Sequence, residues 1–184
     1  MSEILGTLVH ELAHLSSRRS LGPGLPPWLS EGVADDLAES RMDETGSLHP
    51  GKLSEGIRIE GRRVTRWGGV ATALELQGLS KAGNLPTLEV LMEMDRDQFY
   101  EPGSMRLHYA LSSFWIRYLV SGFDAGLQKG FLEFLQDVAD GEPLTKSHFL
   151  HSVDTDWHGL EAGFRIWLQL QFLQPRDETR DESS

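Results

Sequence analysis

The stretch His10-Glu11-Leu12-Ala13-His14 is the most informative part of this 184-residue chain about its fold. Its two histidines are four positions apart, and residues at i and i+4 lie on the same face of an α-helix. Both imidazole rings can therefore reach one metal ion. Glu11 projects from the next position round the helix, where its carboxylate can take a proton from a water molecule on that ion rather than bind the metal. The stretch predicts a helix that carries part of a metal site.

The residues around this stretch predict how the helix packs. Apolar residues recur at helical spacing and form one arc of its surface: Ile4, Leu8, Leu12 and Leu15. Because this arc lies away from the two histidines, we expect it to pack into a core while the histidines face a cleft. Ser2 and Glu3 suit the amino end of the helix, and Arg18 and Arg19 before Gly22 suit its carboxyl end.

A metal ion held by two histidines needs at least one more protein ligand and an open position for water. The Gly/Pro-rich connector at residues 22–27 breaks the first helix and lets the chain double back. A second helix is predicted from Pro27 or Trp28, because proline is accepted at a first helical position. Its predicted buried stripe is formed by residues at helical spacing: Leu29, Val33 and Leu37.

Another face of this second helix carries Glu31 and Asp35, one turn apart. We expect the connector to bring Glu31 beside His10 and His14. Asp35 is then placed to hydrogen-bond the outer nitrogen of a metal-bound histidine, which is the usual role of a carboxylate behind such a ligand. The alternative is a solvated acidic face, formed by Glu31, Asp35, Asp36 and Glu39. It would be the better interpretation if the first helix had no histidines.

H-E-x-x-H at residues 10–14 is the signature of zinc metallopeptidases. Together with Trp-Leu-Ser-Glu-Gly-Val-Ala-Asp at residues 28–35, it resembles the gluzincins of the peptidase MA-like clan, which includes thermolysin and the M1 aminopeptidases. Four later segments resemble the bacterial peptidase MA-like domains known as DUF1570: residues 85–88, 94–95, 109–114 and 164–168. The resemblance covers most of residues 3–173 and is most specific over residues 10–35.

The resemblance implies a catalytic domain over residues 1–173 that binds one Zn²⁺ per chain. It implies His10, His14 and Glu31 as the zinc ligands, Glu11 as the general base and Asp35 as the support for His10. The implied activity is zinc-dependent hydrolysis of peptide bonds in a peptide or protein substrate. Two alternatives stay open, namely a catalytically degenerate relative that keeps its zinc and a helical interaction module in which H-E-x-x-H is accidental.

In gluzincins a β-sheet precedes the active-site helix, and its edge strand binds the substrate by strand addition. Here the helix begins within a few residues of Met1. We therefore expect either the carboxyl-terminal part of a longer protein, with an upstream domain or a partner chain completing the cleft, or a reduced relative with an open site. Strand addition needs a sheet edge, so we expect weak or undetectable cleavage of general substrates by these 184 residues alone.

Peptide hydrolysis also needs a donor for the oxyanion that forms at the scissile carbonyl. Tyr109 is the leading candidate, because it opens the segment that resembles the tyrosine-bearing helix of the family. His108 beside it is the alternative. The remaining histidines that lie in polar or loop contexts are interpreted as surface residues: His49, His148, His151 and His158.

The rest of the chain predicts a mainly α-helical fold, with a helical bundle after the first two helices. Further helices are predicted over residues 70–79, 87–94, 104–121, 126–139, 144–153 and 157–173, and a short β-hairpin over residues 57–65. Aromatic residues on these helices are expected in the core: Phe114, Trp115, Phe131 and Trp167. The charged tail, residues 174–184, is expected to be disordered.

Composition excludes several classes of function. The net charge is −11 with no basic stripe, which argues against nucleic-acid binding. No stretch has the apolar length of a membrane span, and the first residues do not form a signal peptide. The chain has no cysteine, so only nitrogen and oxygen ligands are available to a metal.

Overall fold

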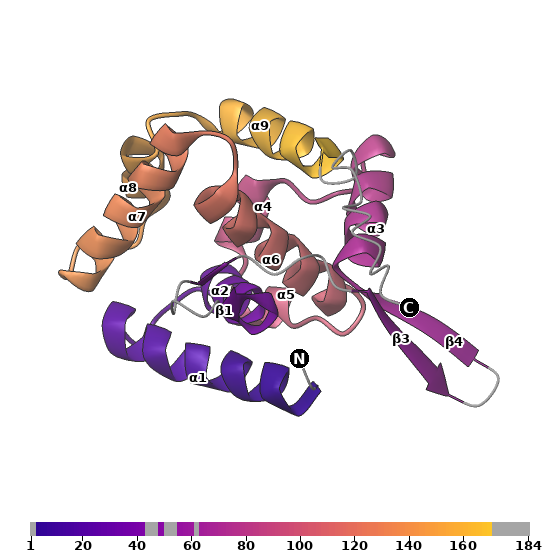
Figure 1. Ribbon diagram of the computed structural model, residues 1–184. Coiled ribbons are helices and arrows are strands. Elements are labelled where there is room, and N and C mark those ends of the chain that lie inside the picture. The colour runs from indigo at the N-terminus through magenta and orange to yellow at the C-terminus, as the bar shows by residue number, and fades with distance from the viewer. Residues whose placement is uncertain (1–2, 43–47, 50–54, 61–62, 171–184) are drawn as a thin grey trace, which may run out of the picture.

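The computed structural model describes residues 3–42, 48–49, 55–60 and 63–170 (Figure 1). Over these residues the protein is mainly helical, as the sequence predicts. The helices are α1 (Glu3–Leu21), α2 (Pro27–Glu39), α3 (Gly69–Lys81), α4 (Leu88–Glu93), α5 (Arg96–Phe99), α6 (Met105–Ser121), α7 (Ala125–Ala139), α8 (Lys146–Ser152) and α9 (Trp157–Leu170). All the helices expected from the sequence are present, and the four-residue α5 is an addition. The tail at residues 174–184 lies outside the described residues.

Local sequence accounts for the ends of the first two helices. Gly22 follows α1 with a φ of +94°, a conformation that glycine adopts without a steric penalty. Pro26 caps α2 in an extended conformation, and Pro27 occupies the first turn, where no amide hydrogen is needed. The connector therefore stops one helix and starts the next within a few residues.

Helix α6 lies in the middle of the molecule and contacts α2, α3, α4, α7 and α9 (Figure 1). The core around it is rich in aromatic rings, and the four aromatics expected there are all buried: Phe114, Trp115, Phe131 and Trp167. Rings from separate helices meet in this core. Trp115 of α6, for example, packs against Phe149 of α8 and Phe164 of α9, with ring centroids about 6 Å apart.

Helix α2 lies between α1 and α6 and approaches α6 closely. A Cβ atom on Gly32 would lie 2.7 Å from the main-chain oxygen of Ser112, so only glycine allows this approach. A buried ion pair fixes the same two helices, because Arg117 Nε of α6 donates to Asp36 Oδ1 at 2.9 Å. Both side chains are less than a tenth exposed. Helix α2 is therefore held in one position against the core.

The strands within the described residues form two small antiparallel sheets. β3 (Glu55–Glu60) pairs with β4 (Arg63–Gly68), which is the hairpin expected from the alternating pattern, and it contacts α3 (Figure 1). β1 (Arg41–Met42) pairs with β2 (Leu48–His49) over two residues each. None of the described helices is both long and apolar enough to cross a membrane.

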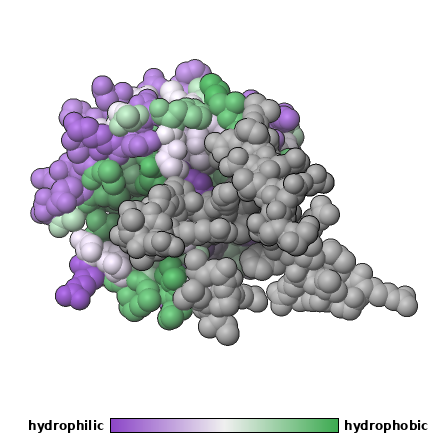
Figure 2. Space-filling model, viewed as in Figure 1, coloured by the Kyte–Doolittle hydropathy of each residue, from purple (hydrophilic) through white to green (hydrophobic). Residues whose placement is uncertain are grey.

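One sequence expectation is wrong, namely that the leucine arc of α1 packs into a core. Leu8 and Leu12 are each 53% exposed and Leu15 is 64% exposed. Figure 2 shows hydrophobic surface along the lower edge of the molecule, where Figure 1 places α1. The reason is that α1 turns its histidine face, which includes the buried Ala13, toward α2. The leucines on the opposite face are then left toward solvent.

Candidate metal centre

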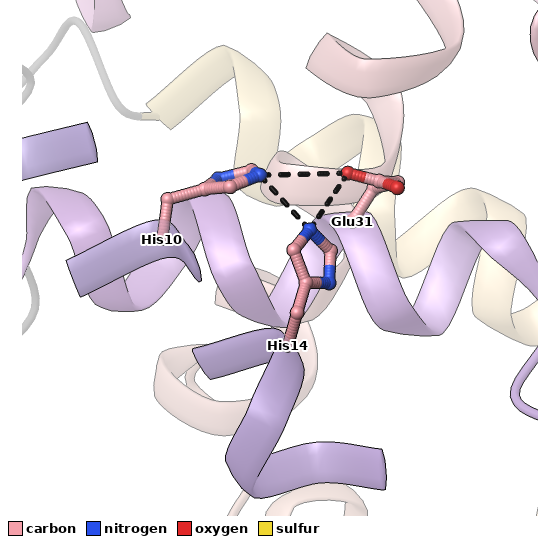
Figure 3. Close-up of side chains that lie close together, drawn as sticks. All are labelled: His10, His14 and Glu31. Carbon is pink, nitrogen blue, oxygen red and sulfur yellow. Dashed lines mark hydrogen bonds and ion pairs between the residues drawn. The ribbon is translucent and has the colours of Figure 1, made fainter. Parts of the chain in front are cut away.

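Three donor atoms from α1 and α2 converge in the structure. His10 and His14 are one turn apart on α1, and their Nε2 atoms are 3.0 Å apart. Glu31 Oε2, from the first half of α2, lies 3.6 Å from His10 Nε2 and 3.3 Å from His14 Nε2. Figure 3 shows both rings pointing at the same carboxylate oxygen. Among the described residues, this is the group of histidine and carboxylate side chains arranged to hold a metal ion.

The Oε2 atom of Glu31 is buried and accepts no hydrogen bond, although both imidazole nitrogens lie near it. A buried carboxylate oxygen without a partner costs free energy. Each neutral imidazole has one nitrogen with a lone pair, and here the Nε2 atoms also face the oxygen. A cation at the centre of the three atoms would satisfy all of them. The residues present therefore fit a metal ion with nitrogen and oxygen ligands.

The outer nitrogens of both histidines have partners on α2. His10 Nδ1 lies 2.9 Å from Asp35 Oδ1, and His14 Nδ1 lies 3.0 Å from Ser30 Oγ. With Nδ1 bonded in this way, each ring directs its Nε2 atom toward Glu31. The hydrogen bond to Asp35 raises the pKa of His10 above its usual value; burial of the ring opposes this shift, and nearby carboxylates add to it.

Of the acidic side chains of α2 that the structure describes, two are buried, so they do not form the solvated face that was the alternative. Glu31 is 6% exposed and Asp36 is 7% exposed. Asp36 forms an ion pair with Arg117. Burial raises the pKa of Asp36, and the charge and hydrogen bond of Arg117 partly oppose this shift. Asp35 is partly exposed and takes the position behind His10 that the sequence predicts.

Glu11 lies on α1 beside His10 and is exposed. Its charge is near enough to contribute to the raised pKa of His10. An exposed carboxylate can exchange protons with solvent. Glu11 is not one of the three metal donors, which are His10, His14 and Glu31. The role of Glu11 as a base stays a prediction.

The two candidate oxyanion donors on α6 differ in their surroundings. Tyr109 is half-buried, and burial is the main cause that raises its pKa. The negative charge of nearby Glu31 raises it further. The hydroxyl of Tyr109 therefore borders the donor cluster. His108 is 5% exposed, and its Nδ1 lies 2.8 Å from the main-chain oxygen of Phe99, which holds the ring inside the core. Of the two, Tyr109 is the one whose side chain interacts with Glu31.

Tyr100 belongs to the site and was missed from the sequence. It follows α5, and its hydroxyl donates to Glu31 Oε1 at 2.5 Å. Burial raises its pKa to about 12, and the hydrogen bond to Glu31 contributes. No local pattern marks this residue, because α5 is a single turn and Tyr100 is 69 positions from Glu31. Ser30, in contrast, lies next to Glu31 in the sequence and could have been suspected as a partner for a histidine.

Comparison of the chain with protein-family models, with curated proteins and with solved structures finds no match. Its function is therefore inferred from the chemistry of its own side chains.

Proposed function

We propose that this protein is a zinc-dependent peptidase whose metal is held by His10, His14 and Glu31. The observation that carries the proposal is the meeting of three donor atoms around the unpartnered Oε2 of Glu31. Two histidines and one carboxylate, with a position left for water, are the ligand set of catalytic zinc sites in several peptidases. The exposed Glu11 beside this cluster adds the base that such chemistry requires.

The separations of the three donor atoms are 3.0, 3.3 and 3.6 Å, which lets one ion reach all of them. Two imidazole nitrogens and one carboxylate oxygen are donor types that zinc takes in proteins, whereas magnesium and calcium take oxygen ligands. The donor types therefore favour zinc.

Zinc bound there would acidify a water molecule and polarise the scissile carbonyl. Glu11 would take the proton from that water and later pass it to the leaving amine. Tyr109 would donate a hydrogen bond to the developing oxyanion, because its hydroxyl lies beside the cluster and stays protonated at neutral pH. Asp35 and Ser30 would hold the two imidazoles in place throughout.

The experiment is cleavage of a peptide library by the zinc-loaded full chain, followed by mass spectrometry. We expect slow cleavage that is lost after chelation, returns with zinc, and is lost in Glu11→Gln. The matched control is Glu133→Gln, an exposed glutamate of α7 that pairs with Lys129, and this variant should cleave as the wild type does. Equal cleavage by Glu11→Gln would overturn the mechanism.

Two rival functions predict other results when the zinc content of the protein is measured together with its cleavage of the library. A protein that binds one zinc ion per chain and cleaves nothing in the library would be a zinc-keeping relative without peptidase activity. A protein that binds no zinc would be a helical interaction module with an accidental H-E-x-x-H. The intact Glu11 argues against the first rival, and the buried third donor, Glu31, argues against the second.

A further inference from the structure

The two oxygens of Glu31 have different surroundings. Oε1 accepts the hydrogen bond from the Tyr100 hydroxyl at 2.5 Å. Oε2 faces the imidazole nitrogens of His10 and His14 and accepts no hydrogen bond. The carboxylate is thus divided, with one oxygen committed to a protein donor and the other directed into the donor cluster.

Tyr100 is held firmly enough to impose this division. The preceding residue, Phe99, is fully buried, and its ring packs against those of Tyr100 and Tyr109 at centroid distances of 5.2 and 5.6 Å. Asp95 caps α5 in a reciprocal capping box. The main-chain oxygen of Phe99 is bonded to the buried His108 of α6. The backbone that carries Tyr100 is therefore tied to the core through Phe99.

The division of the carboxylate has a consequence for any metal in the site. A carboxylate can bind an ion through one oxygen or chelate it through both. With both histidines and a water bound, a chelating Glu31 would give the ion five ligands in place of the four of a typical catalytic zinc site. For Oε1 to reach the ion, the carboxylate of Glu31 would have to turn, and the hydrogen bond from Tyr100 opposes that turn. A charge-assisted hydrogen bond of this kind is among the stronger ones in proteins.

We propose that Tyr100 is a positioning residue that holds Glu31 as a one-oxygen ligand and so keeps the metal site four-coordinate, with water as the fourth ligand. This inference rests on the proposed zinc centre. The phenol is the donor in this hydrogen bond, because an ionised carboxylate can only accept. Tyr100 acts through Glu31 and does not itself meet the metal or the substrate.

The test is the coordination number of Co²⁺ bound to the full chain in place of zinc. Four-coordinate Co²⁺ absorbs visible light several times more strongly than five- or six-coordinate Co²⁺, so the spectrum reports ligand number directly. We expect the wild type to show strong four-coordinate bands. Tyr100→Phe should still bind one cobalt ion, but with less than about half of that absorbance, because Glu31 Oε1 is released to chelate the ion.

The matched control is Tyr118→Phe. Tyr118 is the third tyrosine of the chain, lies on α6, and packs against Trp115, Phe164 and Trp167 in the core. This variant loses a buried phenol hydroxyl away from the donor cluster and should keep the wild-type spectrum. A Tyr100→Phe protein with one bound cobalt ion and an unchanged spectrum would overturn the inference.

A second measurement does not depend on the folding of a variant. X-ray absorption at the zinc edge of the wild-type protein should show four-coordinate zinc without the short zinc-to-carbon distance of a chelating carboxylate. Finding that distance would overturn the inference while leaving the zinc centre in place. A wild-type protein that takes up neither zinc nor cobalt would instead refute the zinc centre itself, and with it the proposed function.

Discussion

Zinc should stabilise this chain against thermal unfolding, because its proposed ligands come from two different helices. His10 and His14 belong to α1 and Glu31 belongs to α2, so the three donor atoms meet only when the two helices are docked. Three leucines of α1, namely Leu8, Leu12 and Leu15, are more than half exposed and add little to the packing of this helix. A metal ion would therefore act as a cross-link between α1 and the α2–α6 core.

The size of the effect follows from binding linkage. A ligand that binds only the folded state at a free concentration of 100 times its Kd stabilises that state by about 2.7 kcal/mol. For a chain of this length, each kcal/mol raises the unfolding midpoint by about 2–4 °C, so we expect a rise of about 5–10 °C. Replacing His14 by Ala removes one ligand. If affinity falls 100-fold, the stabilisation drops to about 0.4 kcal/mol and the rise to about 1–2 °C.

The assay is thermal unfolding followed by circular dichroism, with zinc added to chelator-treated protein. Glu11→Gln should keep the full rise, since Glu11 is not among the three donors. His151→Ala, which removes an exposed histidine of α8, should keep it as well. An equal rise in the wild type and in His14→Ala would show that zinc stabilises the protein at another place. No rise in the wild type at saturating zinc would refute the proposed ligand set.

Three further predictions follow from the surroundings of the donor cluster. Asp35→Asn should weaken zinc affinity by about 10–100-fold in competition with a chelating dye, because the charge that orients His10 is lost; an unchanged Kd would mean that Asp35 does not orient the ligand. In the metal-free protein, the raised pKa of His10 implies a stabilisation that is complete below its unfolded pKa of 6.5 and is lost as pH rises through the higher folded value. As pH rises above 6.5, the free energy of unfolding in urea should therefore fall more steeply in the wild type than in Asp35→Asn, and parallel curves would contradict this. Gly32→Ala should cost about 1–3 kcal/mol of stability and weaken zinc binding, because the added Cβ would force α2 from Ser112 and carry Glu31 with it; wild-type zinc affinity and stability would show that α2 can shift without cost.

The local periodicity of the sequence predicts much of this fold. Helical spacing of apolar residues indicates the helices from α1 to α9, apart from the single turn α5, and alternation around Gly61 indicates the hairpin. These features depend on residues within one or two turns of each other. The same is true of the spacing between His10 and His14, which places both rings on one side of α1.

Periodicity does not predict which element packs against each face of a helix. The leucines of α1 form an apolar arc, and the sequence predicts that this arc is buried, yet Leu12 is 53% exposed. Amphipathic spacing states that a helix has an apolar face, but it does not state which element packs on it. In the folded chain, α1 packs on α2 through the face that carries its histidines and Ala13. Which face of α1 is covered depends on where α2 lies against α6.

By itself, the sequence determined a mainly helical chain, the types of the candidate metal donors and the one-turn spacing of two of them, because these properties depend on near neighbours in the chain. Only the tertiary structure decided that Tyr100 would hydrogen-bond Glu31 and that Arg117 would form a buried ion pair with Asp36. These pairs are 69 and 81 positions apart. No short-range pattern connects such residues, since their contact depends on how α2, α5 and α6 pack together around one aromatic core.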